Sequence, residues 1–159
     1  MWRWLRALTG RTEGAARRPA PHLERPRYLN PGPWPVFIGI STSEEGFKRE
    51  MRRLGMSEVP FLASEHASAT THHLVSKRGE SCWIVTIGSC RGRSREQVAA
   101  LVAHEATHVV QGMRAELAAG SPLGDEAEAY LVQMMVQEFL RHLWRSTKTR
   151  ATRPGGVER

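Results

Sequence analysis

The residues with the clearest chemical potential in this chain are His104-Glu105-Ala106-Thr107-His108. Two histidines four residues apart lie on the same face of a helix, one turn apart, so both imidazoles can bind one zinc ion. The carboxylate of Glu105, next to the first histidine, can accept a proton from a water molecule on that ion. The spacing therefore predicts a metal centre with a general base beside it.

The surrounding sequence predicts that this motif lies within one helix, over residues 94–111. Ser94 is a favourable N-cap, and Glu96 and Gln97 fall in the first turn. The neighbours of the motif are mostly small or apolar, which predicts a buried helix. Because histidines and a carboxylate are costly to bury without a metal or polar partners, these features favour a metal site over a helix with two ordinary histidines.

A catalytic zinc site needs a third protein ligand. One known continuation of the motif has a histidine ten residues after the first, but Arg114 holds that position and Gln111 replaces the preceding glycine, so that subtype is excluded. The other common solution is a glutamate from a second helix. Glu126 and Glu128 both lie near the start of such a helix, which follows Ser121-Pro122 and continues into a long apolar stretch.

With these residues the chain resembles the gluzincins, the zincin metallopeptidases with two helix histidines and a downstream glutamate, and is similar to their small phage-borne or regulator-cleaving members. The resemblance covers about residues 36–145 and is carried by the two helical motifs. It implies that His104, His108 and Glu126 bind Zn²⁺ and that Glu105 is the general base. Tyr130 stands where the family pattern has an acidic or amide residue. Glu128 remains open as an alternative ligand, or as a solvated helix residue.

The activity implied by the resemblance is zinc-dependent hydrolysis of a peptide bond in a protein or peptide substrate. The small size of the domain suggests a narrow specificity. Tyr130 lies one turn after Glu126 and is either a further catalytic residue, contacting a polarised carbonyl oxygen, or a core residue with a satisfied hydroxyl. The alternative function is a non-catalytic, zinc-stabilised binding or virion-associated module that acts through basic tails. Glu105 argues against this alternative, because a structural zinc site does not require that carboxylate.

The elements expected to position these residues form a small α+β domain. The sequence predicts strands at 35–40, 69–75 and 81–88, with the last two paired as a hairpin, and a helix at 43–55. The zincin-like fold implied by the resemblance is a short, mostly antiparallel sheet packed on the helix of His104 and on the following glutamate-bearing helix. We expect strand 81–88 to be the sheet edge, where an extended peptide could pair.

Basic charge is concentrated at the two ends of the chain. Residues 1–30 carry seven arginines and two glutamates (+5), and residues 141–159 carry six basic residues and one glutamate (+5), so with a total of +7 the middle has −3. We expect a flexible, basic, Pro/Gly/Arg-rich segment at 1–35, the metallopeptidase domain at 36–145 and a flexible basic tail at 146–159. The tails could bind an anionic partner, either nucleic acid or a membrane surface, or act as solubilising ends.

The remaining features point to less specific roles. The chain has no stretch as long as the apolar core of a signal peptide or a membrane span, which predicts a cytoplasmic protein. Cys82 and Cys90 lack a CxxC spacing and are expected to be reduced thiols. His66, His72 and His73 are expected mainly as polar loop and strand residues, and strand alternation lets at most one of the last two face the site.

Overall fold

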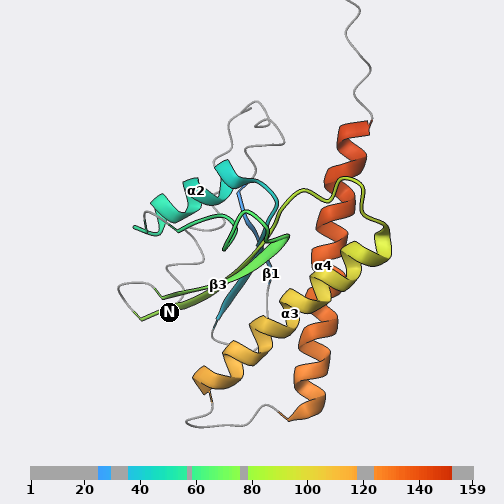
Figure 1. Cartoon of the computed structure of the whole chain (residues 1–159). Helices are drawn as coiled ribbons and strands as arrows, with labels where there is room; N and C mark the ends of the chain where they lie inside the picture. Colours follow the sequence, from blue (N-terminus) through green and yellow to red (C-terminus); the bar gives the residue numbers. More distant parts are fainter. Residues whose placement is uncertain (1–24, 30–35, 57–58, 76–78, 118–123, 152–159) are drawn as a thin grey trace, which may run out of the picture.

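The computed structural model describes residues 25–29, 36–56, 59–75, 79–117 and 124–151. Along this part of the chain (Figure 1) the elements are strand β1 (Arg27–Leu29), strand β2 (Phe37–Ser41), helix α2 (Glu44–Arg53), strand β3 (Ala69–Val75), strand β4 (Ser81–Ile87), helix α3 (Arg95–Leu117) and helix α4 (Asp125–Ala151). The α+β class is therefore confirmed.

The four strands form one small mixed sheet in the order β1-β2-β4-β3. β2 and β4 are parallel and are connected by way of α2 and β3, whereas β1–β2 and β3–β4 are antiparallel. In the hairpin pair, His72 lies opposite Ile84 and His73 opposite Trp83. The expected hairpin pairing of the two strands is thus confirmed, and two of the three strand pairs are antiparallel.

The prediction that strand 81–88 forms the sheet edge is wrong. β4 is internal, because β2 pairs with one of its sides and β3 with the other. Its residues 82–87 are accordingly buried on both faces, as is typical of a strand inside a sheet. The edge next to α3 is β3, whose second side pairs with no other strand of the described sheet.

β1 is a strand that the sequence pattern did not predict, and it lies inside the range 1–35 that was expected to precede the domain. It is held by Tyr28, whose hydroxyl donates a 3.0 Å hydrogen bond to the buried carboxylate of Glu50 on α2. Gly39 on β2 makes room for the tyrosine ring, since a Cβ there would lie 3.0 Å from Tyr28 Cδ1. Residues 1–24 lie outside the described part of the chain.

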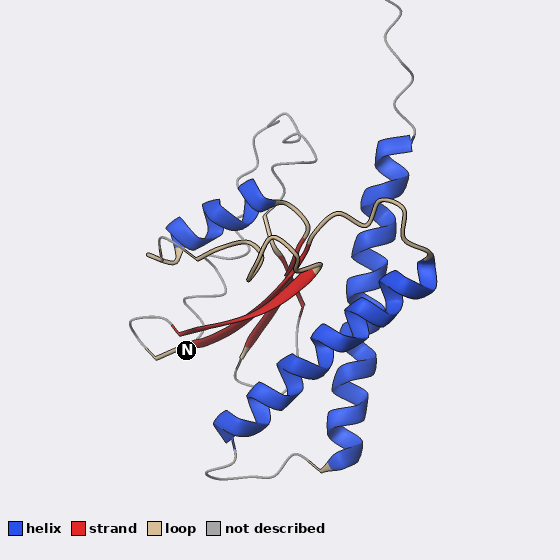
Figure 2. Ribbon diagram, in the orientation of Figure 1, coloured by secondary structure: helices blue, strands red, loops and turns tan. Residues whose placement is uncertain are grey.

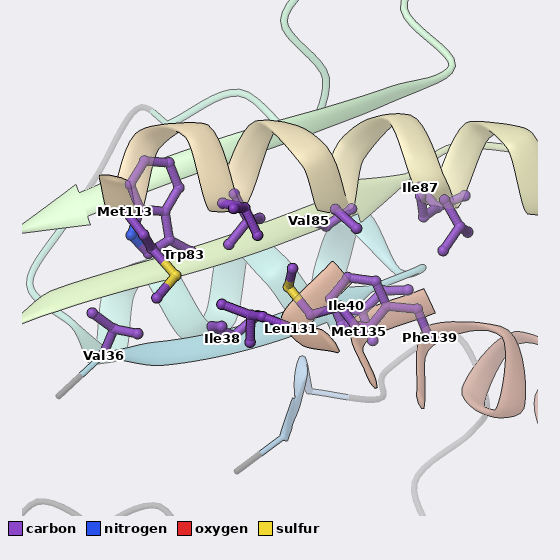
Figure 3. Packing of buried hydrophobic residues seen from close by; sticks show 14 of the residues in the cluster. Val36, Ile38, Ile40, Trp83, Val85, Ile87, Met113, Leu131, Met135 and Phe139 are labelled. Atoms are coloured by element: carbon purple, nitrogen blue, oxygen red, sulfur yellow. The ribbon is translucent and has the colours of Figure 1, made fainter. Parts of the chain in front are cut away.

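Helices cover both faces of the sheet (Figure 2), with α3 and α4 on one face and α2 on the other. The larger apolar core lies between the sheet and α3 and α4 (Figure 3) and includes Ile38, Val85, Val102, Met135 and Phe139. The smaller core lies beneath α2 and includes Phe47, Met51 and Ile84. Side chains of β4 enter both cores, which places this strand at the centre of the domain.

The N-cap of α3 explains where this motif-bearing helix begins. The Ser94 hydroxyl accepts a bond from the Gln97 amide at 3.3 Å, and the Gln97 side chain accepts one from the Ser94 amide at 2.8 Å, which is a capping box. α3 thus begins as predicted but runs on to Leu117. α4 extends to Ala151, into the range 146–159 expected to be a flexible tail, and residues 152–159 lie outside the described part.

None of the helices in the described part of the chain combines the length and the apolar character that crossing a membrane requires. Residues 1–24 and 30–35 of the expected N-terminal segment, and the predicted cap at Ser121-Pro122, lie outside the described residues.

Candidate metal centre

The two motif histidines converge on the exposed surface of α3. The Nε2 atoms of His104 and His108 lie 3.0 Å apart, and the rings are perpendicular, with centroids separated by 4.5 Å. Two nitrogen ligands on one tetrahedral zinc ion lie about 3.3 Å apart, given Zn–N bonds of about 2.0–2.1 Å. The pair therefore has almost the spacing that a shared zinc ion requires.

The ring of His108 is oriented by its own helix. Its Nδ1 atom lies 3.3 Å from Oε1 of Gln111, one turn further along α3. When Nδ1 carries the proton, it donates to that amide oxygen, and the lone pair on Nε2 is left to bind a metal. Gln111, which excluded one zincin subtype at the sequence level, is thus the residue that orients His108.

Glu105 is buried where α3 meets the sheet, whereas the two histidines are exposed. Its side chain is 6% exposed, and Oε2 accepts a 2.7 Å hydrogen bond from the hydroxyl of Thr71 on the edge strand β3. The same hydroxyl lies 3.2 Å from the backbone oxygen of Glu105. The sequence did not single out Thr71. Strand alternation would have placed it on the same face as His73, but no sequence signal identified its partner on α3.

The structure does not bring Glu126 to the histidine pair. Glu126 is exposed in the first turn of α4, and Tyr130, one turn later, is 62% exposed. No three histidine, cysteine or acidic side chains of the described residues are grouped closely enough to hold a metal ion. His104 and His108 therefore fit zinc as two ligands, but the third expected ligand is not in place.

Glu128 is also separated from the histidines, and its contact with Arg114 shows why. The Glu128 carboxylate, with the side chain 16% exposed, lies 3.5 Å from the Arg114 guanidinium. Arg114 is six residues beyond His108, which corresponds to about 9 Å along the helix and about 120° around it. The start of α4 therefore contacts a different face of α3 from the one that carries the histidine pair.

Glu128 nevertheless differs from a solvated helix residue. Its Oε1 atom is buried and has no hydrogen-bond partner among the described residues. An unpaired buried carboxylate oxygen is costly, so the ion pair with Arg114 satisfies Glu128 only in part. Glu128 therefore lies between the two helices and is not a solvated helix residue, and its role as an alternative ligand stays a prediction.

The second histidine group is divided between the two faces of the sheet, as strand alternation predicted. His72 faces α2, where its Nε2 lies 3.2 Å from the Phe61 carbonyl oxygen and 3.1 Å from the Thr86 hydroxyl. Burial lowers the pKa of His72. His73 faces the other way and stacks on Trp83, with ring centroids 4.2 Å apart.

Two further groups of polar side chains lie outside the motif. His73 pairs with Glu116 on α3 at 2.5 Å, whereas His66 is exposed on the loop before β3 and lies 3.5 Å from Glu65. Cys82 and Cys90 are free thiols, and burial raises the pKa of Cys82 to about 12. A thiol with that pKa is protonated at neutral pH and is a poor nucleophile.

Comparison of the chain with known protein families, with characterised proteins and with solved structures finds no match.

Proposed function

We propose that the protein is a zinc-dependent peptide-bond hydrolase of narrow specificity. The observation that carries the proposal is the convergence of His104 and His108, with Nε2 atoms 3.0 Å apart, on the same helix as the buried carboxylate of Glu105. Two imidazoles at metal-binding distance and an adjacent carboxylate are the groups that hydrolysis by an activated water requires.

Each of these side chains has a separate role in the proposed reaction. His104 and His108 hold zinc, which when bound supplies a Lewis acid and lowers the pKa of water. Glu105 accepts the proton of the attacking water and returns it to the leaving amine. Since Oε2 of Glu105 receives the Thr71 hydrogen bond, Oε1 is the atom left to take that proton. Thr71 is thus a positioning residue.

The edge strand β3 supports a peptide as the substrate. β3 contacts α3 through Thr71 and Glu105, and its second side pairs with no other described strand. An extended peptide can add to such an edge through backbone hydrogen bonds. A peptide bound there would run along α3, next to the carboxylate of Glu105.

Glu126 is the third metal ligand in this proposal. Its spacing matches the family pattern, whereas Glu128 is already engaged with Arg114. Because Glu126 is exposed and apart from the histidine pair, the proposal requires the first turn of α4 to move toward His104 and His108 when the ion binds. Tyr130, also exposed on that turn, would move with it.

The packing between α3 and α4 argues against the non-catalytic alternative, in which zinc would hold the two helices together. Both helices already contribute buried apolar side chains to one core, among them Val102, Val109 and Met113 from α3 and Met135 and Phe139 from α4. A core of this kind stabilises the helix pair without a metal. An exposed histidine pair is better suited to a site that remains open to a substrate.

The deciding experiment compares the wild type with Glu105→Gln, each loaded with zinc, on a mixed peptide library. We expect both proteins to retain the same zinc content and thermal stability. Glu105→Gln should lose cleavage by about 10²–10⁴-fold, because the amide cannot accept the proton. Equal cleavage patterns in the two zinc-loaded proteins, or no cleavage by either, would favour the non-catalytic alternative.

A further inference from the structure

The histidine pair on α3 is an incomplete zinc site within a single chain. His104 and His108 bring two nitrogens to within 3.0 Å of each other on an exposed surface, whereas zinc in proteins takes four ligands. No third histidine, cysteine or acidic side chain of the described residues joins the pair. The nearby carboxylate of Glu105 is buried and accepts a hydrogen bond from Thr71. Further protein ligands therefore come either from a movement of α4 or from another molecule.

A second copy of the chain supplies the missing ligands without a movement of α4. The same two histidines converge in each copy, so two pairs provide four imidazole nitrogens, the number that a tetrahedral zinc ion takes. A twofold axis through the ion makes the two contributions identical, as in most protein dimers. Coordination by Glu126 requires α4 to shift first, because that side chain is apart from the pair.

The surface around the histidine pair lets a second helix approach. The exposed positions of α3 within about 60° of the pair around the helix axis are uncharged, and two of them are alanines: Gln97, Ala100, Gln111 and Ala115. Uncharged side chains can be covered by a partner without the cost of desolvating an ion. This face of α3 is therefore compatible with burial against a copy of itself.

Two charged residues on one flank of this face are complementary to each other in an antiparallel pair of helices. Glu96 and Arg114 are separated by five full turns, so they lie on the same side of α3. The midpoint between them is one residue from the midpoint of the histidine pair. A twofold axis through the ion and perpendicular to α3 therefore brings Glu96 of one chain to within about 3 Å of Arg114 of the other, measured along the helix axis.

The contacts that Glu96 and Arg114 make within one chain leave room for this second pairing. Arg114 contacts Glu128 but is 60% exposed, and a guanidinium has five N–H donors. Glu96 accepts the 2.6 Å hydrogen bond from Ser94 through Oε2, and a carboxylate has a second oxygen. Opposite charges thus face each other twice in the antiparallel dimer, which favours this arrangement over a parallel one.

We propose that zinc, when it is scarce relative to the chain, joins two copies through His104 and His108 of each, with the two α3 helices antiparallel. A site closed by four protein nitrogens leaves no position for water, so this dimer is an inactive form. When zinc is in excess, each pair binds its own ion, and the dimer dissociates by mass action. Because it uses the same zinc site, the dimer rests on the proposed function and adds regulation by zinc supply to it.

The test is sedimentation velocity of the full chain at a fixed concentration, with the bound zinc measured on the same samples. In a chelator the protein should have the 17.9 kDa mass of one chain. Half an equivalent of zinc should double that mass, with one ion per two chains, and several equivalents should return it to one chain. His104→Ala should stay at the mass of one chain throughout, whereas the exposed control His66→Ala should behave as the wild type.

A charge reversal tests the antiparallel arrangement. Glu96→Lys replaces two attractive contacts with two repulsive ones and should raise the Kd of the zinc-bound dimer roughly tenfold. Glu45→Lys is the matched control, because Glu45 also pairs with the serine that caps its helix, Ser43, but lies on α2 across the sheet. Equal effects of the two substitutions would overturn the antiparallel arrangement.

Glu126→Gln distinguishes the dimer from the proposed peptidase site. This variant keeps the histidine pair and lacks the proposed third ligand, so it should form the dimer at half an equivalent of zinc and keep it when zinc is in excess. A wild type that stays at the mass of one chain and binds zinc through Glu126 would overturn the dimer and leave the peptidase standing. A wild type that stays dimeric in excess zinc and cleaves no peptide would support the dimer and overturn the peptidase.

Discussion

The hydroxyl of Thr71 on the edge strand β3 donates a 2.7 Å hydrogen bond to the carboxylate of Glu105 on α3. This bond joins the strand that is open to an extended peptide and the carboxylate proposed as the general base. A hydrogen bond to a charged group stabilises a protein by about 1.5–3 kcal/mol, and it also fixes the orientation of that group. The position of the proposed base is therefore set by the sheet as well as by its own helix.

The first prediction concerns Thr71. Thr71→Val keeps the shape and the β-branching but removes the donor, so cleavage should fall about tenfold or more while the zinc content stays unchanged. Thr71→Ser restores a hydroxyl and should recover most of the activity. Peptide cleavage and metal content measured on the same preparations provide the check. If the serine variant is as impaired as the valine variant, the hydrogen bond is not the cause.

The second prediction is metal content. The wild-type protein should hold close to one zinc ion per chain, measured by elemental analysis after dialysis. His104→Ala and His108→Ala should each lose it, because a single remaining imidazole binds the ion far more weakly. His73→Ala is the control, since His73 stacks on Trp83 away from the pair. A folded wild type that takes up no zinc from solution would end the metallopeptidase proposal.

The third prediction separates the two glutamates of α4. Glu126→Gln should reduce zinc retention and leave thermal stability unchanged, because the side chain is exposed in the metal-free protein. Glu128→Gln should have the opposite profile, with zinc retained and stability altered, because it changes a partly buried ion pair with Arg114. Zinc loss that is equal in both variants, or greater in Glu128→Gln, would show that the ligand assignment is incorrect.

The fourth prediction is a dependence of stability on pH through His72. Burial disfavours the charged imidazole and outweighs the Phe61 carbonyl and Glu105, so the pKa of His72 is lower in the folded protein than in the unfolded chain. As the pH falls below about 6.5, His72 is protonated in the unfolded chain before it is protonated in the folded protein. The free energy of unfolding therefore decreases until the pH reaches the pKa of His72 in the folded protein.

Urea unfolding between about pH 5 and 8 measures this effect. His72→Gln can still donate to the Phe61 carbonyl oxygen but cannot titrate, so the decline in stability at acidic pH should become shallower. The exposed His66 supplies the control, and His66→Gln should keep the wild-type slope. Parallel slopes in His72→Gln and the wild type would assign the acid sensitivity to other groups.

The fifth prediction concerns the contact between Gly112 and Trp83. A Cβ at position 112 would overlap the indole ring of Trp83 at Cη2, so Gly112→Ala forces α3 away from the sheet. We expect a loss of about 1–3 kcal/mol or more in the free energy of unfolding, measured in urea. Gly124→Ala is the comparison, because a Cβ at position 124 would meet no atom within 4 Å beyond its chain neighbours. Equal stability of the two variants would contradict this packing.

The elements that depend on local signals could be predicted from the amino-acid sequence. Strand alternation predicted that His72 and His73 face opposite sides of β3, and the apolar patterns located β3, β4 and the two long helices. The His104–His108 spacing likewise predicted convergence of the two rings, because both residues lie within one turn of a single helix. All these relations are fixed by the repeat of one strand or one helix.

Contacts between segments far apart in the chain could not be predicted in this way, because they depend on tertiary packing. β1 has three residues and no pattern of its own, and it is a strand because Tyr28 reaches Glu50 and its ring packs over Gly39. β4 is internal because β2 pairs with the side of β4 that lies opposite β3.

The arrangement of the candidate metal centre also depends on tertiary packing. Helix periodicity does not determine which face of α3 the start of α4 contacts. The Arg114–Glu128 contact places the start of α4 away from the histidine pair. The hydrogen bond between Thr71 and Glu105 spans 34 residues. Contacts at such separations depend on how whole elements pack against one another, because the burial of apolar surface that drives packing is non-directional and is not encoded in any short stretch of sequence.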